Sequence, residues 1–263
     1  MAASTNFGPI RYDVDDAIAT ITIDRPERLN AFDQAVFAGL NEAMARFKSD
    51  DEARVAILTA SGDRAFSAGF DIKAGDQAVS GGGLGATNAF LLDFMDDDMG
   101  GKPVIFAGFG RCVGQGVSLA AWADLRIAAD TTLFSVPEAK IGISAQSLPG
   151  QLVDLLGASV AHYFLLYGED LTAEWARSVG FVHEVVPFDQ LLPRARAVAA
   201  SMIGQGPLAL AAHKRILKAA MTRPRDEAIA LAKELRRQTL RSNDFREGMR
   251  AFNERRPPDY TGT

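Results

Sequence analysis

The chain has 263 residues, of which 48% are hydrophobic and 23% are charged, and its formal net charge is −5. This length supports one buried core, or one domain with a small appendage. The acidic balance argues against a nucleic-acid or anionic-membrane surface. The single cysteine, Cys112, excludes an internal disulfide and a cysteine zinc cluster.

The N-terminal residues show no secretory signal, because 1–6 contain no positive segment followed by an apolar one. No uninterrupted apolar run in the sequence is long enough to span a bilayer. We therefore expect a soluble cytoplasmic protein without a membrane or nucleic-acid partner.

Strands and helices alternate in the N-terminal part. Residues 10–14 and 17–23 alternate apolar with polar or small residues around Asp15-Asp16, which predicts a β-hairpin. Asp33 is placed to cap a helix with apolar residues at helical spacing, namely Val36, Phe37, Leu40, Met44 and Phe47. Further strands are predicted at 54–60, 103–109 and 125–128. This order predicts an α/β fold with largely parallel pairing.

The pattern from Leu148 onward is almost wholly helical. Helices are predicted at 148–156, 159–167, 172–179, 188–203, 207–221, 224–240 and 244–253. One short strand at 182–186 interrupts them. A helical C-terminal third on an α/β core indicates a second layer or a trimerisation region.

Two segments between the predicted strands lack chemistry of their own. The glycine-rich stretch 75–85 is typical of a flexible loop over strand ends. The acidic run Asp96-Asp97-Asp98 indicates a solvated helix end. A metal site is disfavoured there, since three adjacent carboxylates on a helix cannot all face one ion.

The first site signal is the run Phe66–Lys73, which lies beyond the strand at 54–60 and the turn at Ser61-Gly62-Asp63. Loops at strand ends often carry chemistry on a rigid scaffold. The small pair Ala68-Gly69 lets a ligand approach the main chain closely. Backbone N–H groups held there can receive a developing negative charge.

The second signal is the segment Gly108–Ala120, which follows a predicted strand and opens a helix. A helix N-terminus offers free N–H groups and a positive dipole end, which favour anions. A dinucleotide fingerprint is excluded, because Leu119 stands where Gly or Ala is required. The sequence contains no Walker signature.

The third signal is Glu138 within Phe134–Gly142, where it stands among apolar and small residues. Burial raises the pKa of a carboxyl group, which suits a proton shuttle near neutral pH. The simpler alternative is a glutamate at a helix start after Pro137, stabilised by the helix dipole.

These segments together resemble the crotonase family, the enoyl-CoA hydratase/isomerase superfamily. Five stretches carry the resemblance in order, and they span nearly the whole chain: Ile21–Ala31, Phe66–Lys73, Gly108–Ala120, Phe134–Gly142 and Glu247–Pro257. The resemblance implies a crotonase-like spiral of ββα units. Residues 1–200 would form this spiral core, and 201–263 a helical C-terminal trimerisation region.

The resemblance also implies an acyl-CoA thioester substrate, with no cofactor besides the coenzyme A that the substrate carries. Two backbone amides would hold the thioester oxygen as it becomes an enolate, namely those of Phe70 and Gln115. The second donor departs from the family's usual Gly-Gly-Gly, so Gly114 and Gly116 remain alternatives to Gln115. The assembly implied is a homotrimer or a dimer of trimers.

Binding positions for coenzyme A are implied in the same way. The residues that match positions lining the CoA arm are Leu29, Ala68, Asp71 and Ile72. The basic residues placed to meet its phosphates are Arg28, Lys73, Arg255 and Arg256.

The acids present bear on the reaction. Family hydratases use two glutamates; one matches Glu138, and the other position holds Ser118. Because Ser is a poor base alone, double-bond isomerisation of an enoyl-CoA fits the single glutamate better than hydration. Hydration or dehydration remains an alternative if Ser118 holds water, or if a carboxylate at Asp93, Asp96 or Asp97 reaches the pocket.

Two named branches of the family share some of these features. Members that hydrate and cleave hydroxycinnamoyl-CoA also carry this serine, but they use a tyrosine that 224–240 lacks. Glu138-Ala139-Lys140 resembles the carnitinyl-CoA dehydratase branch, again without its other acid.

Two different classes of protein compete with this prediction. Gly116–Ala120 nearly spells a nucleophile elbow, with Ser118 as nucleophile and His183 or His213 as base. The sequence lacks the accompanying His-Gly-Gly oxyanion stretch, and the three histidines, which include His162, are expected at the surface. The other alternative is a CoA-binding trimer without activity, which the missing acid favours and the retained Glu138 opposes.

Overall fold

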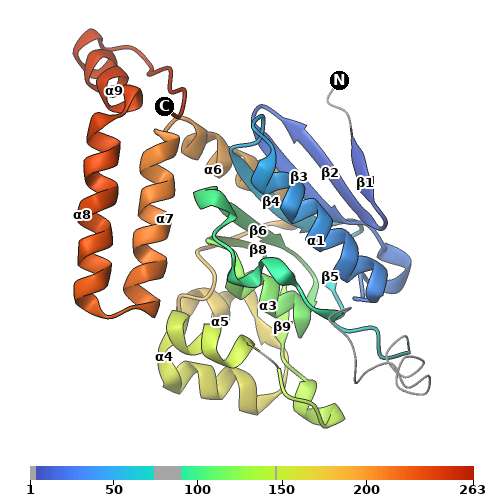
Figure 1. The fold of residues 1–263 in the computed structure, drawn as a ribbon. Coiled ribbons are helices and arrows are strands. Elements are labelled where there is room, and N and C mark those ends of the chain that lie inside the picture. Colours follow the sequence, from blue (N-terminus) through green and yellow to red (C-terminus); the bar gives the residue numbers. More distant parts are fainter. Residues whose placement is uncertain (1–3, 74–89, 146) are drawn as a thin grey trace.

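The structure is a computed structural model that describes residues 4–73, 90–145 and 147–263. Two β-sheets form its centre, and helices cover them (Figure 1). The glycine-rich loop predicted at 75–85 lies outside the described residues.

The larger sheet has seven strands in the order β1-β2-β3-β4-β6-β8-β11. The first three strands are antiparallel, and all later neighbours are parallel. Their bounds are β1 Thr5–Phe7, β2 Ile10–Asp15, β3 Ile18–Ile23, β4 Val55–Ala60, β6 Val104–Gly108, β8 Leu125–Ala129 and β11 Glu184–Val186. The predicted hairpin and the predicted parallel strands are therefore confirmed.

The smaller sheet has the order β10-β9-β7-β5. Its strands are β5 Ala65–Ser67, β7 Arg111–Val113, β9 Leu133–Ser135 and β10 Leu171–Thr172. The chain alternates between the sheets in three successive pairs of strands: β4 and β5, β6 and β7, and β8 and β9. In each pair the first strand lies in the larger sheet and the second in the smaller sheet. This alternation, with helices between successive pairs, is the predicted spiral of ββα units.

Local chemistry explains two of the boundaries. The hairpin between β2 and β3 turns at Asp16 and Ala17, which both adopt positive φ angles of 51° and 60°, as a tight hairpin turn requires. The Asp33 carboxylate accepts a hydrogen bond from the Val36 N–H at 3.0 Å. It thereby caps the helix as its sequence position predicted.

The helices pack in layers around the sheets. Their bounds are α1 Gln34–Ser49, α3 Gln115–Trp122, α4 Leu148–Tyr167, α5 Ala173–Ser178, α6 Leu191–Ile203, α7 Pro207–Thr222, α8 Arg225–Arg241 and α9 Asn243–Glu254. Helix α1 packs on β1, β2 and β3, while α6 packs on β4, β6 and β8. The two predicted helices at 148–156 and 159–167 are two halves of α4 that meet at a non-helical residue, Gly157.

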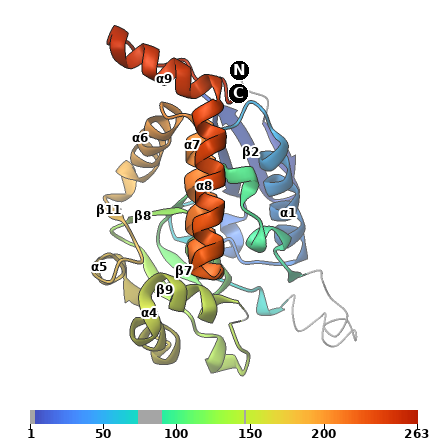
Figure 2. The same cartoon turned by 60° about the vertical axis from the view of Figure 1, so that its left-hand side comes forward.

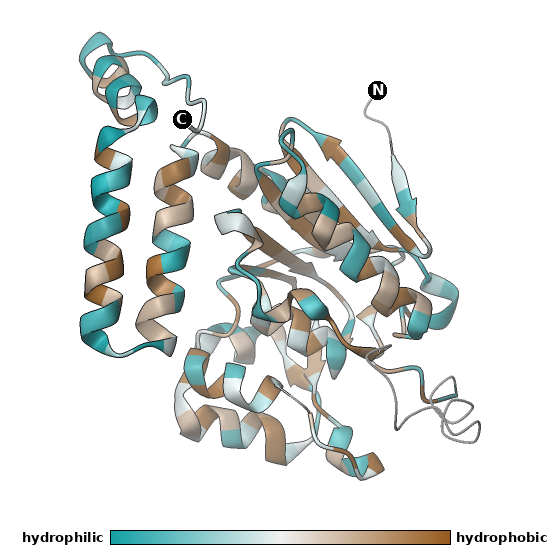
Figure 3. Cartoon of the chain, in the orientation of Figure 1, coloured by the Kyte–Doolittle hydropathy of each residue, from teal (hydrophilic) through white to brown (hydrophobic). Residues whose placement is uncertain are grey.

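The last helices lie beside the core. Helices α7 and α8 form an antiparallel pair along one side, and α9 extends from its end (Figures 1 and 2). Hydrophobic residues concentrate on the central strands, whereas α8 is largely hydrophilic (Figure 3). The predicted boundary between 200 and 201 lies inside α6, and the division into two regions stays a prediction.

The acidic run Asp96-Asp97-Asp98 is not the solvated helix end that the sequence predicted. It spans two short 3-10 turns, η4 Asp93–Asp96 and η5 Met99–Gly101. Asp97 pairs with Lys48 from α1, and Asp98 pairs with Arg215 from α7. These carboxylates are ion-paired rather than simply solvated, because basic residues on two packed helices face them. Within the described residues, no helix has both the length and the apolar character needed to cross a bilayer.

Candidate active site

The three predicted site segments follow three adjacent parallel strands of the smaller sheet. Phe70 comes after β5, Gln115 after β7 and Glu138 after β9. The carboxyl ends of parallel strands lie at one edge of a sheet, which is where ligands commonly bind in α/β folds. The spiral thus brings together segments that lie far apart in the sequence.

Close approaches at three glycines lock the segments together. A Cβ atom on Gly69, whose φ is +83°, would lie 3.1 Å from the Val113 carbonyl oxygen. A Cβ atom on Gly116 would lie 3.3 Å from the Ser67 Cβ atom. The first and second segments are therefore in direct contact, and only glycine fits at the tightest points.

The third segment packs against the second at Gly114. This residue has φ 52° and ψ −108°, and a Cβ atom on it would lie 2.5 Å from Glu138 Oε1. The Gly114 N–H donates to the Ser135 carbonyl oxygen at 2.9 Å. This bond ties the turn between β7 and α3 to the end of β9. The Glu138 carboxylate therefore lies at the start of α3.

The Phe70 N–H is a free amide of the first segment, and it lies between two amides that are bonded. Its neighbours are used: the Gly69 N–H donates to Ser67 Oγ at 3.0 Å, and the Asp71 N–H donates to the Phe32 carbonyl at 2.9 Å. The Phe70 N–H makes no hydrogen bond with any described residue. Its neighbours hold it in place while it remains available to a ligand.

The start of α3 supplies further free N–H groups. A helix leaves its first N–H groups without intrahelical acceptors, and no hydrogen bond among the described residues uses the N–H of Gln115 or Gly116. The N–H of Gly114, the third candidate donor, is already bonded to Ser135. The contacts therefore favour Gln115 or Gly116 over Gly114 as the second donor.

Glu138 is the candidate acid, and it is half-buried at the start of the 3-10 turn η6, Glu138–Ile141. Its Oε2 atom is buried and has no hydrogen-bond partner among the described residues. Burial raises the pKa of this carboxyl group, and a hydrogen bond from its own backbone opposes the shift. A carboxylate held this way gains from accepting a proton.

Ser118 lies one turn into α3 and is buried. Its hydroxyl donates to the Gly114 carbonyl oxygen at 3.5 Å. Among the described residues, no hydrogen bond joins Ser118 to His183 or His213. His183 Nδ1 instead accepts from the Arg126 N–H at 3.0 Å, so the contacts of a hydrolase triad are missing from the part of the chain described.

The predicted coenzyme A positions gather beside the first segment. The Ala68 N–H donates to the Leu29 carbonyl at 2.9 Å, and Leu29 adopts a left-handed conformation with φ 52°. Asp71 and Ile72 follow Phe70 directly, and Lys73 ends this described stretch. Arg28 ends the 3-10 turn η1, Pro26–Arg28, next to Leu29.

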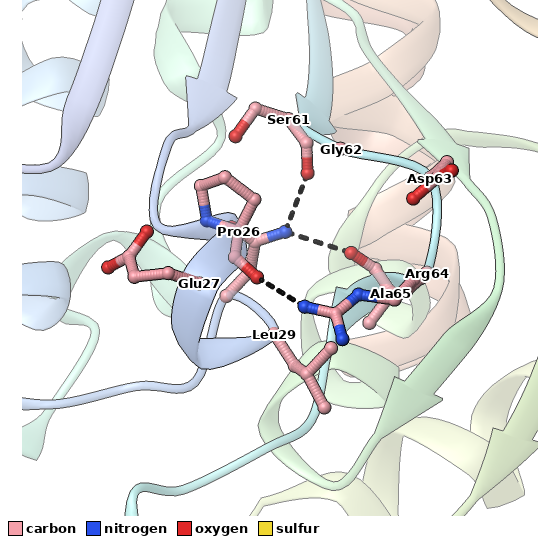
Figure 4. A pocket seen from close by; sticks show the side chains of 9 residues that line it. Pro26, Glu27, Leu29, Ser61, Gly62, Asp63, Arg64 and Ala65 are labelled. Atoms are coloured by element: carbon pink, nitrogen blue, oxygen red, sulfur yellow. Dashed lines mark hydrogen bonds between the residues drawn. The ribbon is translucent and has the colours of Figure 1, made fainter.

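A pocket of about 240 Å³ lies at the Leu29 end of this cluster (Figure 4). It lies between the 26–30 turn and the 61–65 turn, where the Arg64 guanidinium donates to the Pro26 carbonyl at 3.2 Å. Leu29 is the one predicted CoA residue that lines this pocket.

Two predicted phosphate-binding residues lie elsewhere. Arg255 follows α9, which Figure 1 places on the opposite side of the molecule from β5. Arg256 pairs with Glu247 and Glu254, in both cases at 2.6 Å. These contacts hold the segment after α9 in place, so neither arginine joins the cluster around Leu29 within this chain.

Sequence reasoning missed the residues that hold the first segment in place. Arg25 pairs with Asp33 at 3.0 Å and with Asp71 at 3.2 Å, which joins the start of α1 to the segment after β5. Asn30 Nδ2 donates to the carbonyl oxygens of Ser61 and Ala65. Both residues lie in the quoted stretch Ile21–Ala31, but their partners are too distant in sequence to be read from it.

Comparison with families and curated proteins agrees with this geometry. Residues 13–263 match the family model described as enoyl-CoA hydratase/isomerase. A carnitinyl-CoA dehydratase from Salmonella enteritidis is 36% identical over 257 residues, which cover 93% of this chain and 95% of the relative.

Solved structures share the whole fold. An enoyl-CoA hydratase from Mycobacterium tuberculosis superposes with a TM-score of 0.89 at 34% identity, covering 97% of this chain and 100% of that one. An enoyl-CoA hydratase/carnithine racemase from Magnetospirillum magneticum gives a TM-score of 0.89 at 30% identity, covering 99% and 97%.

Proposed function

Because this chain belongs to the enoyl-CoA hydratase/isomerase family, we propose that it acts on an acyl-CoA thioester through an enolate. One observation carries the proposal: main-chain N–H groups and the Glu138 Oε2 atom, none with a hydrogen-bond partner among the described residues, lie at the ends of three adjacent strands. The N–H groups of Phe70 and Gln115 would stabilise the thioester oxygen, and Glu138 would move the proton.

The oxyanion hole supplies most of the stabilisation in this scheme. As the α-proton leaves, negative charge moves from carbon to the thioester oxygen, where fixed N–H donors stabilise it without reorganising. Losing one such donor costs roughly 3–4 kcal/mol of transition-state stabilisation. Gln115 is preferred over Gly116 because it is the first residue of α3 and follows directly the glycine that packs against Glu138.

The reaction that best fits one glutamate is double-bond isomerisation. The Glu138 carboxylate takes a proton from the α-carbon of a 3-enoyl-CoA, and the C–H electrons form a dienolate. The protonated Glu138 then returns the proton to the γ-carbon, which leaves a 2-enoyl-CoA. Burial raises the pKa of Glu138, which makes its carboxylate a stronger base for the uptake of this proton.

Water addition or elimination is the second candidate, and the identity to a carnitinyl-CoA dehydratase supports it. This chemistry needs a second group that orients water or the leaving hydroxyl. Ser118, one turn along α3 from Gly114, is the residue that would hold the water. The pairing of Asp97 with Lys48 makes that carboxylate a poor second acid.

Substrate binding follows from the same cluster. We propose that Leu29, Ala68, Asp71 and Ile72 contact the CoA arm, and that Arg28 and Lys73 meet its phosphates. Arg255, on the far side of the molecule, would meet a phosphate only in an assembled homotrimer or dimer of trimers, which we propose as the active form.

Incubation with 3-enoyl-CoA and, separately, with 2-enoyl-CoA in water distinguishes these candidates. We expect 3-enoyl-CoA to be converted to 2-enoyl-CoA, and Glu138→Gln to abolish that conversion. Efficient hydration that falls on Ser118→Ala would instead favour the second candidate. Tight CoA-ester binding without turnover of either substrate would favour a binding protein and contradict both reactions.

A further inference from the structure

A buried arginine lies at the far end of the helix that opens on the proposed oxyanion hole. Arg126 of β8 is only 4% exposed. Its guanidinium donates to three carbonyl oxygens, those of Ala120, Ala123 and Phe181. Among the described residues, no carboxylate forms a salt bridge with it. The proposed reaction does not use this buried cation directly.

Two of its three acceptors belong to the C-terminal end of α3. Ala120 lies in the last turn of the helix, and Ala123 is its C-terminal cap. Gln115, the proposed donor, is the first residue of the same helix. The eight residues of α3 span about 12 Å at the usual rise per residue, so one short rigid element connects Arg126 to the hole.

The charge of Arg126 is well placed to act through this helix. The C-terminal end of a helix carries a partial negative charge, which disfavours an anion bound at the N-terminal end. A cation at the C-terminal end offsets this partial charge. The neighbouring Asp124 carboxylate accepts from the Val104 N–H and from Lys214 Nζ, both at 2.7 Å, rather than from Arg126. Burial lowers the pKa of Arg126 to about 10, which leaves it protonated at neutral pH.

The contacts also fix where α3 lies. Because Arg126 is on β8, an inner strand of the larger sheet, its hydrogen bonds tie the end of α3 to that sheet. The Phe181 ring packs over the guanidinium at 5.7 Å, which helps to exclude water. In a dry environment the charge–dipole interaction is screened less than at the surface.

We propose that Arg126 is a positioning residue for the reaction: it anchors α3 and offsets the helix's negative end, so that the N–H groups at the other end bind an oxyanion more strongly. This inference rests on the proposed function. The proposed role differs from a purely structural one in a measurable way. It requires that the polarisation of a bound thioester carbonyl depend on the charge at residue 126.

The test measures that polarisation without turnover. Butyryl-CoA with an isotopically labelled thioester carbonyl is saturated, so it can bind but cannot isomerise or add water. Infrared difference spectra report the frequency of its carbonyl stretch when bound. The frequency does not depend on the folded fraction, so a less stable variant still gives a valid reading.

Five proteins are compared with this probe: the wild type, Arg126→Met, Arg126→Lys and two controls, of which the first is Arg54→Met. Arg54 also donates to a main-chain carbonyl, that of Gln205 at 3.0 Å, and among the described residues none of its hydrogen bonds reaches α3. A second control, Phe181→Leu, loosens the packing around the guanidinium and keeps the charge.

We expect binding to the wild type to lower the carbonyl frequency and Arg126→Met to reduce that shift. Arg126→Lys should retain more of it. Arg54→Met should match the wild type, and Phe181→Leu, which keeps the charge but admits more water, should fall between the wild type and Arg126→Met. With 3-enoyl-CoA, Arg126→Met should lower kcat about tenfold with little change in KM, since the effect is on the transition state.

Two results would overturn the inference, and they are distinguishable. If the wild type lowers the carbonyl frequency and Arg126→Met lowers it equally, the oxyanion hole stands but Arg126 has only a structural role. If the wild type itself leaves the frequency unchanged, the proposed oxyanion hole is wrong, and the role of Arg126 is wrong with it.

Discussion

At the scale of single residues, the chain holds buried carboxylates in two different ways. Asp244 accepts hydrogen bonds from the Thr261 and Gly262 N–H groups, and Glu247 accepts from Arg250 and Arg256. Those guanidinium groups hold the pKa of Glu247 well below its usual range. In the part of the chain that the structure describes, Glu138 Oε2 has no such partner, and burial raises the pKa of this carboxyl group. The contrast separates a carboxylate that holds structure from one available for proton transfer.

Removing the acid should abolish the reaction and leave the fold intact. For Glu138→Gln we expect the isomerisation rate to fall by about 10²–10⁴, the usual contribution of general acid–base catalysis. Steady-state assays with 3-enoyl-CoA and a circular dichroism spectrum test this. Glu169→Gln is the matched control, because Glu169 is exposed and its one ion pair within the described part of the chain is with Lys140. An equal loss in both variants would contradict the role of Glu138.

The same residue should make stability depend on pH in a defined direction. A carboxyl group whose pKa is higher in the folded state favours folding when protonated, and this contribution is lost as the pH rises through the folded pKa. Since burial raises the pKa of Glu138, its charged form destabilises the protein at neutral pH. We expect Glu138→Gln to raise the melting temperature at neutral pH and to have less effect in mild acid. Thermal unfolding at several pH values measures this, and an equal effect at every pH would contradict it.

At the scale of elements, length decided most of what could be predicted, although the three-residue strand β11 was predicted, at 182–186. The strands β3, β4, β6 and β8 are long enough for their apolar pattern to predict them. The strands β5, β7 and β9 have three residues each, and so short a run carries no recognisable period. They exist because the spiral pairs them with one another. Although these short strands were missed, the three site segments were predicted, because each is a contiguous run that matches a family motif.

The contacts between elements could not be read from the sequence. Arg25 and Asp71 are 46 positions apart, and nothing local in either segment indicates that they meet. The close approach of Gly114 to Glu138 likewise depends on the pairing of β7 with β9. Long-range geometry of this kind follows from topology rather than from local pattern.

The junction of α3 with Glu138 should be sensitive to a single methyl group. In Gly114→Ala the new Cβ atom would lie 2.5 Å from Glu138 Oε1, so either the acid or the helix start must move. A displacement near 1 Å can cost about 100-fold in rate. Gly100→Ala is the control, because Gly100 also has positive φ, 67°, but nothing lies within 4 Å of its Cβ position.

The two variants separate strain from displacement. Gly100→Ala should lose roughly 1–3 kcal/mol of stability through backbone strain. Gly114→Ala should lose more, because its φ of 52° and ψ of −108° lie outside the left-handed region that Gly100 occupies. Denaturation midpoints measure both losses. The rate with 3-enoyl-CoA should fall only in Gly114→Ala. A full rate in Gly114→Ala would show that the contact with Glu138 does not matter to catalysis.

At the scale of the whole molecule, the C-terminal helices leave apolar surface uncovered. Phe245, Met249 and Phe252 share one face of α9, at the spacing of successive helical turns, and are 45%, 53% and 82% exposed. Contiguous exposed apolar surface is typical of a protein–protein contact. The proposed assembly of three copies would give this face a partner.

Placing a charge on that face should weaken the assembly. Burying a Phe side chain contributes roughly 2–3 kcal/mol, so we expect Phe252→Asp to raise the concentration at which copies associate at least about tenfold. Analytical ultracentrifugation over a dilution series measures this. Asn253→Asp adds the same charge without removing apolar surface and should leave association unchanged. A wild type that stays monomeric at all concentrations would contradict the predicted trimer.

The proposed main-chain donors at Phe70 and Gln115 determine which experiments can detect the site. An alanine scan is blind to them, because Phe70→Ala and Gln115→Ala both keep the N–H group. For the same reason, the side chains at these positions are free to diverge between relatives without changing how the charge is stabilised. Only a change to the backbone itself, such as replacing one amide with an ester by chemical synthesis, would remove a donor and leave the side chain as it is.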